Sequence, residues 1–285
     1  MSEALDWLLP LLAIPSISAD PAHADDVRAA ADFLLELCGT IGLRHTQLLE
    51  APGANPVVYA DWLDVPGRPT VLLYGHYDVQ PVIDASAWTT PPFSPTIRDG
   101  TVVARGASDM KGPLVSMLAA LAELIREGGV PVNVRLLLEG EEEIFSPRLP
   151  GIVRKHRDLL AGDLAVSADG SQPQTGRPRL IIGTRGLCDL QLIVRGARTD
   201  LHSGQYGGAA PNPAQIIAEI VSSFHDREGR VAVEGFYDDI EVPSATDRAS
   251  ITSAKAPSTP ARPCSHGTNA TRASRPTSVW ASARS

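Results

Sequence analysis

A cluster of four glutamates follows an apolar stretch in the middle of the chain, within LLLEGEEEIF (residues 136–145). The apolar run at 132–138 ends there, and Glu139, Glu141, Glu142 and Glu143 follow in close succession. Carboxylates this close repel one another, so water or a bound cation must offset their charge. A solvated surface is the ordinary reading of such a charge block, and the glutamates alone leave both alternatives open.

Further metal-type side chains follow other apolar segments. GHYDVQP supplies His76 and Asp78, SADG supplies Asp169, and ARGASDMKGP supplies Asp109 just before a predicted helix. Taken singly, Asp109 has the alternative of a helix cap and Asp169 that of a turn residue. Ligands of open α/β sheets bind beyond the carboxyl ends of the strands, so the four segments together predict one site at one sheet edge.

The residue types at this edge suit metal-dependent hydrolysis. Imidazole and carboxylates are standard zinc ligands, and two metals about 3.5–4 Å apart can generate hydroxide and polarise a carbonyl. A free glutamate beside them can take the proton of the water and pass it to a leaving amine. In the sequence His76-Tyr77-Asp78, the aspartate can hold the second imidazole nitrogen.

The elements that must position these residues alternate between helix and strand. Helices are predicted by the apolar spacing at residues 22–41 and 110–127, the second with Pro113 in its first turn. Short apolar runs predict buried strands at 70–74, 132–138 and 163–167. This alternation predicts an α/β fold, a mostly parallel sheet with helices on both faces, over residues 1–182.

The pattern changes after residue 183. Residues 186–195 alternate like a half-exposed strand, and Asn212-Pro213 opens a helix that runs through residue 224. We therefore expect residues 183–243 to begin a smaller α+β domain. Residues 244–285 are rich in Ala, Ser, Thr, Arg and Pro and lack helix or strand period, which predicts a disordered, low-complexity tail. The abrupt shift indicates a premature or frame-shifted end.

The composition argues against several classes of protein. The chain has 285 residues and a net charge of −8, which argues against a general nucleic-acid surface. Its three cysteines are too few and too widely spaced for a disulfide framework, which favours a reducing compartment. Residues 1–18 are interrupted by acidic residues and Pro10 and predict a helix rather than a signal peptide. No run approaches the about 20 apolar residues of a membrane span, so we expect a cytoplasmic protein.

The motifs resemble, in order, those of a known family. LLAIPSIS, YGHYDVQP, WTTPPFSPTIRDGTVVARGASDMKG, LLLEGEEEI, SADG, GTRGL and DLHSGQYGG are similar to the aminoacylase/carboxypeptidase group of cocatalytic zinc peptidases. This group includes carnosinase-type dipeptidases, glutamate carboxypeptidase, and the acetylornithine and succinyl-diaminopimelate deacylases. The resemblance covers about residues 11–212, and LEGEEE with HSGQYGG most resembles the dipeptidase branch.

The resemblance implies a metal set of two Zn²⁺ ions. His76 and Asp169 would bind the first zinc, Asp109 would bridge to the second, and Glu143 would bind the second. The peptide between Asp109 and Met110 would be cis, as in family members.

The resemblance also implies three catalytic roles. Glu142 would be the general base and Asp78 would orient His76. His202 would lie on a lid domain and, in a homodimer, reach the partner's site to stabilise the oxyanion. Glu139 and Glu141 need no such role and are expected to be solvated or to support the ligands.

Two departures from the family pattern stand out. Phe145 occupies a position where glycine is usual, and its ring would crowd the glutamate loop unless it turns outward. Family members supply the last histidine ligand of the second zinc after the lid, whereas recognisable sequence fades here between about residues 235 and 244. His266 lacks the surrounding pattern, so we expect a truncated chain without that ligand.

The sequence therefore predicts a zinc-dependent, dipeptidase-like metallopeptidase that hydrolyses an amide bond of a small peptide. An N-acyl amino acid deacylase is an alternative within the same family. A further alternative is an inactive fragment that binds one zinc through His76, Asp109 and Asp169 without turnover.

Overall fold

The computed structural model describes residues 3–170, 181, 186–187 and 190–253. The chain divides into two compact units, residues 1–180 and residues 181–285. The first unit carries the sheet and the candidate metal ligands His76, Asp109, Glu143 and Asp169.

A five-stranded mixed sheet forms the centre of the first unit, in the order β1-β2-β6-β3-β7. Its strands are β1 (Arg44–Leu49), β2 (Val57–Trp62), β3 (Thr70–His76), β6 (Asn133–Glu139) and β7 (Leu164–Ser167). β3 pairs in parallel with β6 and β7, whereas β2 pairs antiparallel with β1 and β6. A separate hairpin joins β4 (Thr96–Arg98) to β5 (Thr101–Val103).

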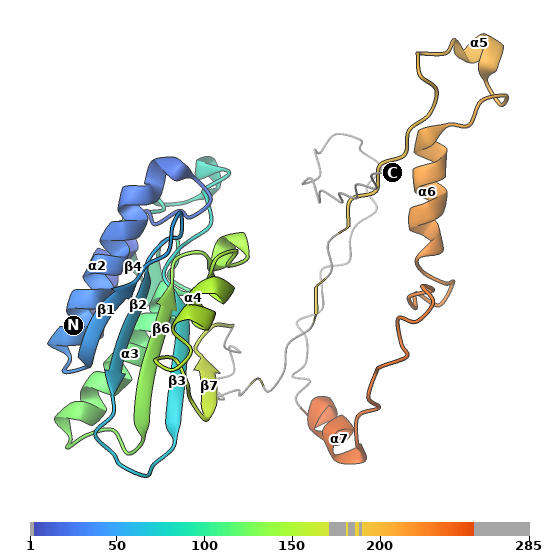
Figure 1. Ribbon diagram of the computed structural model, residues 1–285. Coiled ribbons are helices and arrows are strands. Elements are labelled where there is room, and N and C mark those ends of the chain that lie inside the picture. Colours follow the sequence, from blue (N-terminus) through green and yellow to red (C-terminus); the bar gives the residue numbers. More distant parts are fainter. Residues whose placement is uncertain (1–2, 171–180, 182–185, 188–189, 254–285) are drawn as a thin grey trace. The chain divides into compact units, whose positions relative to one another are not determined.

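Helices cover both faces of this sheet (Figure 1). The helices of one face are α1 (Glu3–Ala13), α2 (Ala24–Thr40) and α3 (Lys111–Arg126), and α4 (Leu149–Lys155) lies on the other. Side chains alternate between the two faces along a strand. Leu136 and Leu138 of β6 therefore pack on the face covered by α1, α2 and α3, whereas Leu137 packs with Ile152 of α4 on the other face.

The predicted α/β class is confirmed, with strands close to the expected positions. The runs at 70–74, 132–138 and 163–167 correspond to the parallel strands β3, β6 and β7. The sequence did not predict β1 and β2, whose antiparallel pairing makes the sheet mixed rather than mostly parallel.

The predicted helices are also present. The helix predicted at 22–41 is α2, preceded by a short 3-10 turn, η1 (Pro21–His23). The Asp20 side chain caps this turn by accepting a hydrogen bond from the amide of Ala22. The 110–127 helix is α3, with Pro113 in its first turn as expected. The N-terminal helix is α1.

The second unit contains three described helices, α5 (Ser203–Tyr206), α6 (Pro213–Ser223) and α7 (Ala245–Ser253). The predicted helix opening at Asn212 is α6, and the Asn212 side chain accepts a hydrogen bond from the amide of Ala214. The predicted strand at 186–195 is wrong in its described part, residues 186–187 and 190–195, which is not assigned as a strand and pairs with no other described residue.

The tail prediction is wrong at its start, because α7 occupies residues 245–253. Ser244 and Asp247 cap this helix reciprocally: Ser244 accepts from the Asp247 amide, and the Asp247 carboxylate accepts from the Ser244 amide. The rest of the predicted tail, residues 254–285, lies outside the described residues, as does His266. Among the helices that the structure describes, none combines the length and apolar character needed to span a bilayer.

Candidate metal centre

Three parallel strands end at the same edge of the sheet and bring the candidate ligands there. His76 is the last residue of β3 and is in register with Glu139, the last residue of β6. β7 pairs with β3 on its other side, and Asp169 follows two residues after its end. The sheet topology thus brings His76 and Asp169 together from segments far apart in sequence.

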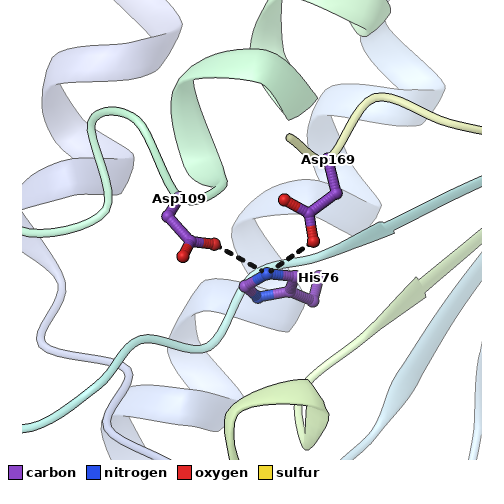
Figure 2. A group of neighbouring side chains, drawn as sticks. All are labelled: His76, Asp109 and Asp169. Carbon is purple, nitrogen blue, oxygen red and sulfur yellow. Dashed lines mark hydrogen bonds and ion pairs between the residues drawn. The ribbon is translucent and has the colours of Figure 1, made fainter. Parts of the chain in front are cut away.

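His76, Asp109 and Asp169 form a compact group (Figure 2). Each offers one ligand atom, and these atoms lie within 4.8 Å of one another. Nε2 of His76 is 3.1 Å from Oδ1 of Asp109 and 3.7 Å from Oδ2 of Asp169. The imidazole is fully buried, whereas Asp109 is largely exposed, so the group opens to solvent on the carboxylate side. The structure therefore assembles three of the four predicted metal ligands.

Asp109 reaches this group from the loop that precedes α3. The peptide bond between Asp109 and Met110 is cis, as the family resemblance implied. The next residue, Lys111, begins α3 with its side chain fully buried. Its Nζ donates to the carbonyls of Leu11 and Ile14, at 2.9 Å and 2.7 Å, where α1 ends.

The other nitrogen of His76 faces acceptors of Asp78. Nδ1 lies 3.2 Å from the Asp78 carbonyl oxygen and 3.4 Å from its carboxylate Oδ1. Nδ1 therefore carries a proton, which leaves Nε2 to face Asp109 and Asp169. Burial lowers the pKa of His76, but the Asp78, Glu142 and Asp109 carboxylates outweigh it and raise the pKa to about 9.

Asp78 is itself buried, and both of its carboxylate oxygens accept hydrogen bonds. Its Oδ2 accepts from the Ser18 hydroxyl at 2.6 Å and from the Glu143 amide at 3.1 Å, and its Oδ1 accepts from the Glu142 amide at 3.2 Å. The residue touches both the imidazole and the glutamate turn, in agreement with the predicted contact to His76.

The two later glutamates lie at the site in different environments. Both belong to the 3-10 turn η3 (Glu142–Ile144). Oε2 of Glu142 is 3.7 Å from Nε2 of His76, and burial, with the charges of Glu143 and Asp169, raises the pKa of Glu142. The Glu143 carboxylate instead accepts from Nε2 of Gln80 at 2.9 Å and does not belong to the three-residue group. Burial, with the nearby charge of Asp109, raises the pKa of Glu143.

The two earlier glutamates are buried, so they are not solvated. Glu139 accepts from the hydroxyls of Tyr74 and Ser146, and burial raises its pKa. Glu141 accepts from the amide of Asn55 and pairs with Arg148 at 3.0 Å. The four glutamates therefore divide into two that support the loop internally and two that face the site.

Phe145 does not crowd the loop. The residue is 79% exposed, and its backbone has φ 67° and ψ 28°, the left-handed region in which glycine is favoured. The sequence had raised an outward turn as the harmless alternative, and the structure adopts it.

His202 belongs to the second unit, where it caps α5. Its Nδ1 accepts a hydrogen bond from the amide of Gly204 at 3.0 Å. Its predicted catalytic role stays a prediction, since the placement of the two units relative to one another is not determined.

Sequence reasoning missed three polar residues that support the site: Ser18, Gln80 and Lys111. Ser18 and Gln80 lie within LLAIPSIS and GHYDVQP, and Lys111 follows the cis peptide. Their presence inside motifs already singled out was a usable signal, but their partners were not readable from spacing.

The donor set fits a divalent cation. Carboxylate oxygens from Asp109, Glu142 and Asp169 converge on a single imidazole nitrogen, and such mixed nitrogen and oxygen ligands suit zinc. In the absence of a cation these carboxylates repel one another, so a bound cation would relieve the repulsion.

Comparison with known proteins points to one family. The sequence profile of "Peptidase family M20/M25/M40" matches residues 72–258. A cysteinylglycine-S-conjugate dipeptidase from Corynebacterium striatum is 33% identical over 216 residues, covering 75% of this chain and 47% of that protein. A Beta-Ala-His dipeptidase from Rattus norvegicus is 35% identical over 186 residues, covering 64% of this chain and 38% of that protein.

A solved structure gives the same indication. An M20 family metallo-carboxypeptidase from Sulfolobus solfataricus superposes with a TM-score of 0.73 at 35% identity, covering 90% of this chain and 57% of that one. The present chain spans about half of the length of several curated relatives that it matches.

Proposed function

The chain belongs to peptidase family M20/M25/M40, and we propose that it carries the metal centre of a dipeptidase-like metallopeptidase. The reaction is hydrolysis of an amide bond in a small peptide. The observation that carries the proposal is the approach of Asp109, Asp169 and Glu142 to Nε2 of one buried histidine, His76.

His76, Asp109 and Asp169 would hold the first cation, which their convergence supports. Asp109 and Glu143 would hold the second, as the family resemblance implies. Zinc is the proposed metal because histidine and carboxylates are its usual ligands. A bound divalent cation supplies Lewis-acid polarisation of the scissile carbonyl and lowers the pKa of water.

The chain's own residues handle the protons. Glu142 accepts the proton of the attacking water and delivers it to the leaving amine, which suits a carboxylate whose pKa burial has raised. Asp78 holds the proton on Nδ1 of His76 and so keeps Nε2 directed at the carboxylates. In the proposed homodimer, His202 donates a hydrogen bond to the oxyanion that develops in the partner subunit's site.

The substrate class follows the names of the relatives. Relatives named for Cys-Gly and β-Ala-His dipeptides support a dipeptide, cut between its two residues. An N-acyl amino acid would present the same amide bond to Glu142, so deacylation is the alternative that a substrate panel must exclude.

The proposal extends to the organisation of the protein. Residues 1–182 form the catalytic part, residues 183–243 belong to a lid and dimerisation domain, and the protein is a homodimer. A reducing, cytoplasmic setting suits the widely spaced cysteines, of which Cys38 is a buried free thiol. Sedimentation of the full chain tests the dimer.

The decisive experiment measures bound zinc per chain and hydrolysis of Cys-Gly, β-Ala-His and N-acetyl amino acids. We expect two cations and dipeptide turnover, with Glu142→Gln lowering turnover by about 10²–10⁴-fold while metal is retained. Glu123→Gln, an exposed change in α3, is the matched control.

A second outcome also has support in the geometry. Because Glu143 is bonded to Gln80 and lies outside the three-residue group, the chain could bind a single cation without turnover. One zinc per chain and no hydrolysis of any substrate would favour this reading and reject the peptidase proposal for this chain.

A further inference from the structure

The turn that carries Glu142 and Glu143 lacks a cap of its own. Within η3, the amides of Ile144, Phe145 and Ser146 donate to the carbonyls of Glu141 and Glu142, at 2.8–3.2 Å. The side chain of Glu141, in the cap position, accepts nothing from the turn. The amides of Glu142 and Glu143 are thus the groups that a helical turn leaves without internal partners.

The Asp78 carboxylate accepts hydrogen bonds from both of these amides. Asp78 lies 64 residues before Glu142 and 65 residues before Glu143. Its carboxylate is fully buried and has about four lone-pair directions. The Ser18 hydroxyl, the two amides and Nδ1 of His76 occupy them. The same carboxylate therefore contacts the imidazole and closes the first turn of the glutamate loop.

Ser18 is held in place by bonds that are independent of the metal-type residues. Ser16, two residues earlier, donates its hydroxyl to the Tyr77 carbonyl at 2.7 Å, and its own carbonyl accepts from the Val79 amide at 3.0 Å. These bonds fasten the segment after α1 to both neighbours of Asp78. The Ser18 hydroxyl, 2.6 Å from Oδ2, is therefore presented to the carboxylate from a fixed backbone.

We infer that Asp78 is the remote cap of the Glu142–Glu143 turn and that Ser18 is the positioning residue that orients this cap. This role goes beyond holding the imidazole of His76. It makes the placement of the proposed general base and of the proposed metal-binding nitrogen depend on one carboxylate. A change at Ser18, which touches neither cation ligand, then moves the turn.

Hydrogen exchange in the metal-free full-length chain tests the inference directly. NMR measures the exchange rates of the Glu142 and Glu143 amides in the unaltered chain and in Ser18→Ala, Ser18→Thr and Asp78→Asn. We expect these two amides to exchange about tenfold faster in Ser18→Ala, the scale of one lost hydrogen bond to a charged group. Ser18→Thr keeps the hydroxyl and should restore the slow rates.

Controls separate local positioning from general loss of stability. Ser116→Ala removes a hydroxyl that bonds the Gly112 carbonyl inside α3, and the rates at Glu142 and Glu143 should not change. The amides of β6 should stay protected in every variant that counts as folded. If Asp78→Asn does not fold, the two Ser18 variants carry the test.

Unchanged exchange at both amides in Ser18→Ala, with β6 still protected, would overturn the inference. Equally faster exchange of the two amides in Ser18→Ala and in Ser18→Thr would also overturn the inference, because the Ser18 hydroxyl would then not be what positions Asp78. Neither result depends on metal binding or turnover, so failure here is distinct from failure of the proposed peptidase function.

Discussion

Nε2 of His76 lies 3.1 Å from Oδ1 of Asp109, although 33 residues separate the two in sequence. Nδ1 of the same ring faces the Asp78 carbonyl and carboxylate. In the metal-free chain the imidazole is therefore enclosed by acceptors on both sides, and this raises its pKa to about 9 despite burial.

The first prediction concerns the pH dependence of metal binding. A cation must displace the proton on Nε2 of His76, which is bound at any pH below about 9. The affinity for Co²⁺ should therefore rise about tenfold from pH 7 to pH 8, with release of close to one proton per ion. Calorimetry in buffers of different ionisation enthalpy measures both quantities.

Two histidine variants test whether His76 is the ligand responsible for metal binding. His76→Ala should abolish binding, whereas His225→Ala, in the second unit, should bind as the unaltered chain does. An affinity that does not change between pH 7 and pH 8 would contradict the assignment of His76 as ligand.

The second prediction concerns the buried Lys111. Burial lowers its pKa to about 7, so between pH 7 and its ordinary value of 10.5 the unfolded chain binds more protons than the folded chain. The lysine contribution to stability must then rise with pH across this window, by at most about 1.4 kcal/mol per pH unit. The raised pKa of His76 gives a contribution of opposite sign up to about pH 9. Urea unfolding of the metal-free unaltered chain and of Lys111→Met from pH 7 to pH 10 should therefore show the lysine contribution as a growing difference between the two.

Lys111→Met should remove the lysine contribution, while Lys155→Met, exposed at the end of α4, should leave the pH profile unchanged. A parallel profile for Lys111→Met and the unaltered chain would show that Lys111 is charged in the folded state.

The third prediction concerns backbone strain at Phe145. A side chain in the left-handed region costs about 1–2 kcal/mol, and the ring of Phe145 is mostly exposed and offsets little of this cost. Phe145→Gly should therefore raise the free energy of unfolding by about 1 kcal/mol, measured as a higher urea midpoint. Phe145→Ala, which removes the ring but keeps a Cβ, should give no comparable gain.

The fourth prediction concerns the tautomer of His202. Because Nδ1 accepts from the Gly204 amide, the neutral ring should carry its proton on Nε2. Long-range ¹H–¹⁵N spectra distinguish the two nitrogens. A Cβ at position 204 would lie 2.8 Å from Cε1 of His202, so Gly204→Ala should break this bond and shift the tautomer populations. A proton found on Nδ1 in the unaltered chain would contradict the structure.

Part of the fold was readable from sequence because the signals were local. Apolar runs located β3, β6 and β7, and apolar spacing with Pro113 located α3. β1 escaped prediction because it is an edge strand whose side chains are mostly exposed, and β2 because its burial depends on pairing with β6, far along the chain. The reciprocal bonds of Ser244 and Asp247 show that α7 had a capping signal, hidden by the composition around it.

By itself, the sequence determined that His76 and Asp169 would share one edge of the sheet, whereas Asp109 reaches that edge from the loop before α3. The reason is that parallel strands end on the same side, so a polar residue after each apolar run is placed by topology alone. The tertiary structure decided how the four glutamates divide. Glu139 and Glu141 are buried against Tyr74, Ser146, Asn55 and Arg148, while Asp78 and Gln80 hold the turn of Glu142 and Glu143. Adjacent carboxylates of one chemical type differ only in the partners that the folded chain brings to them, and the spacing of the glutamates does not encode those partners.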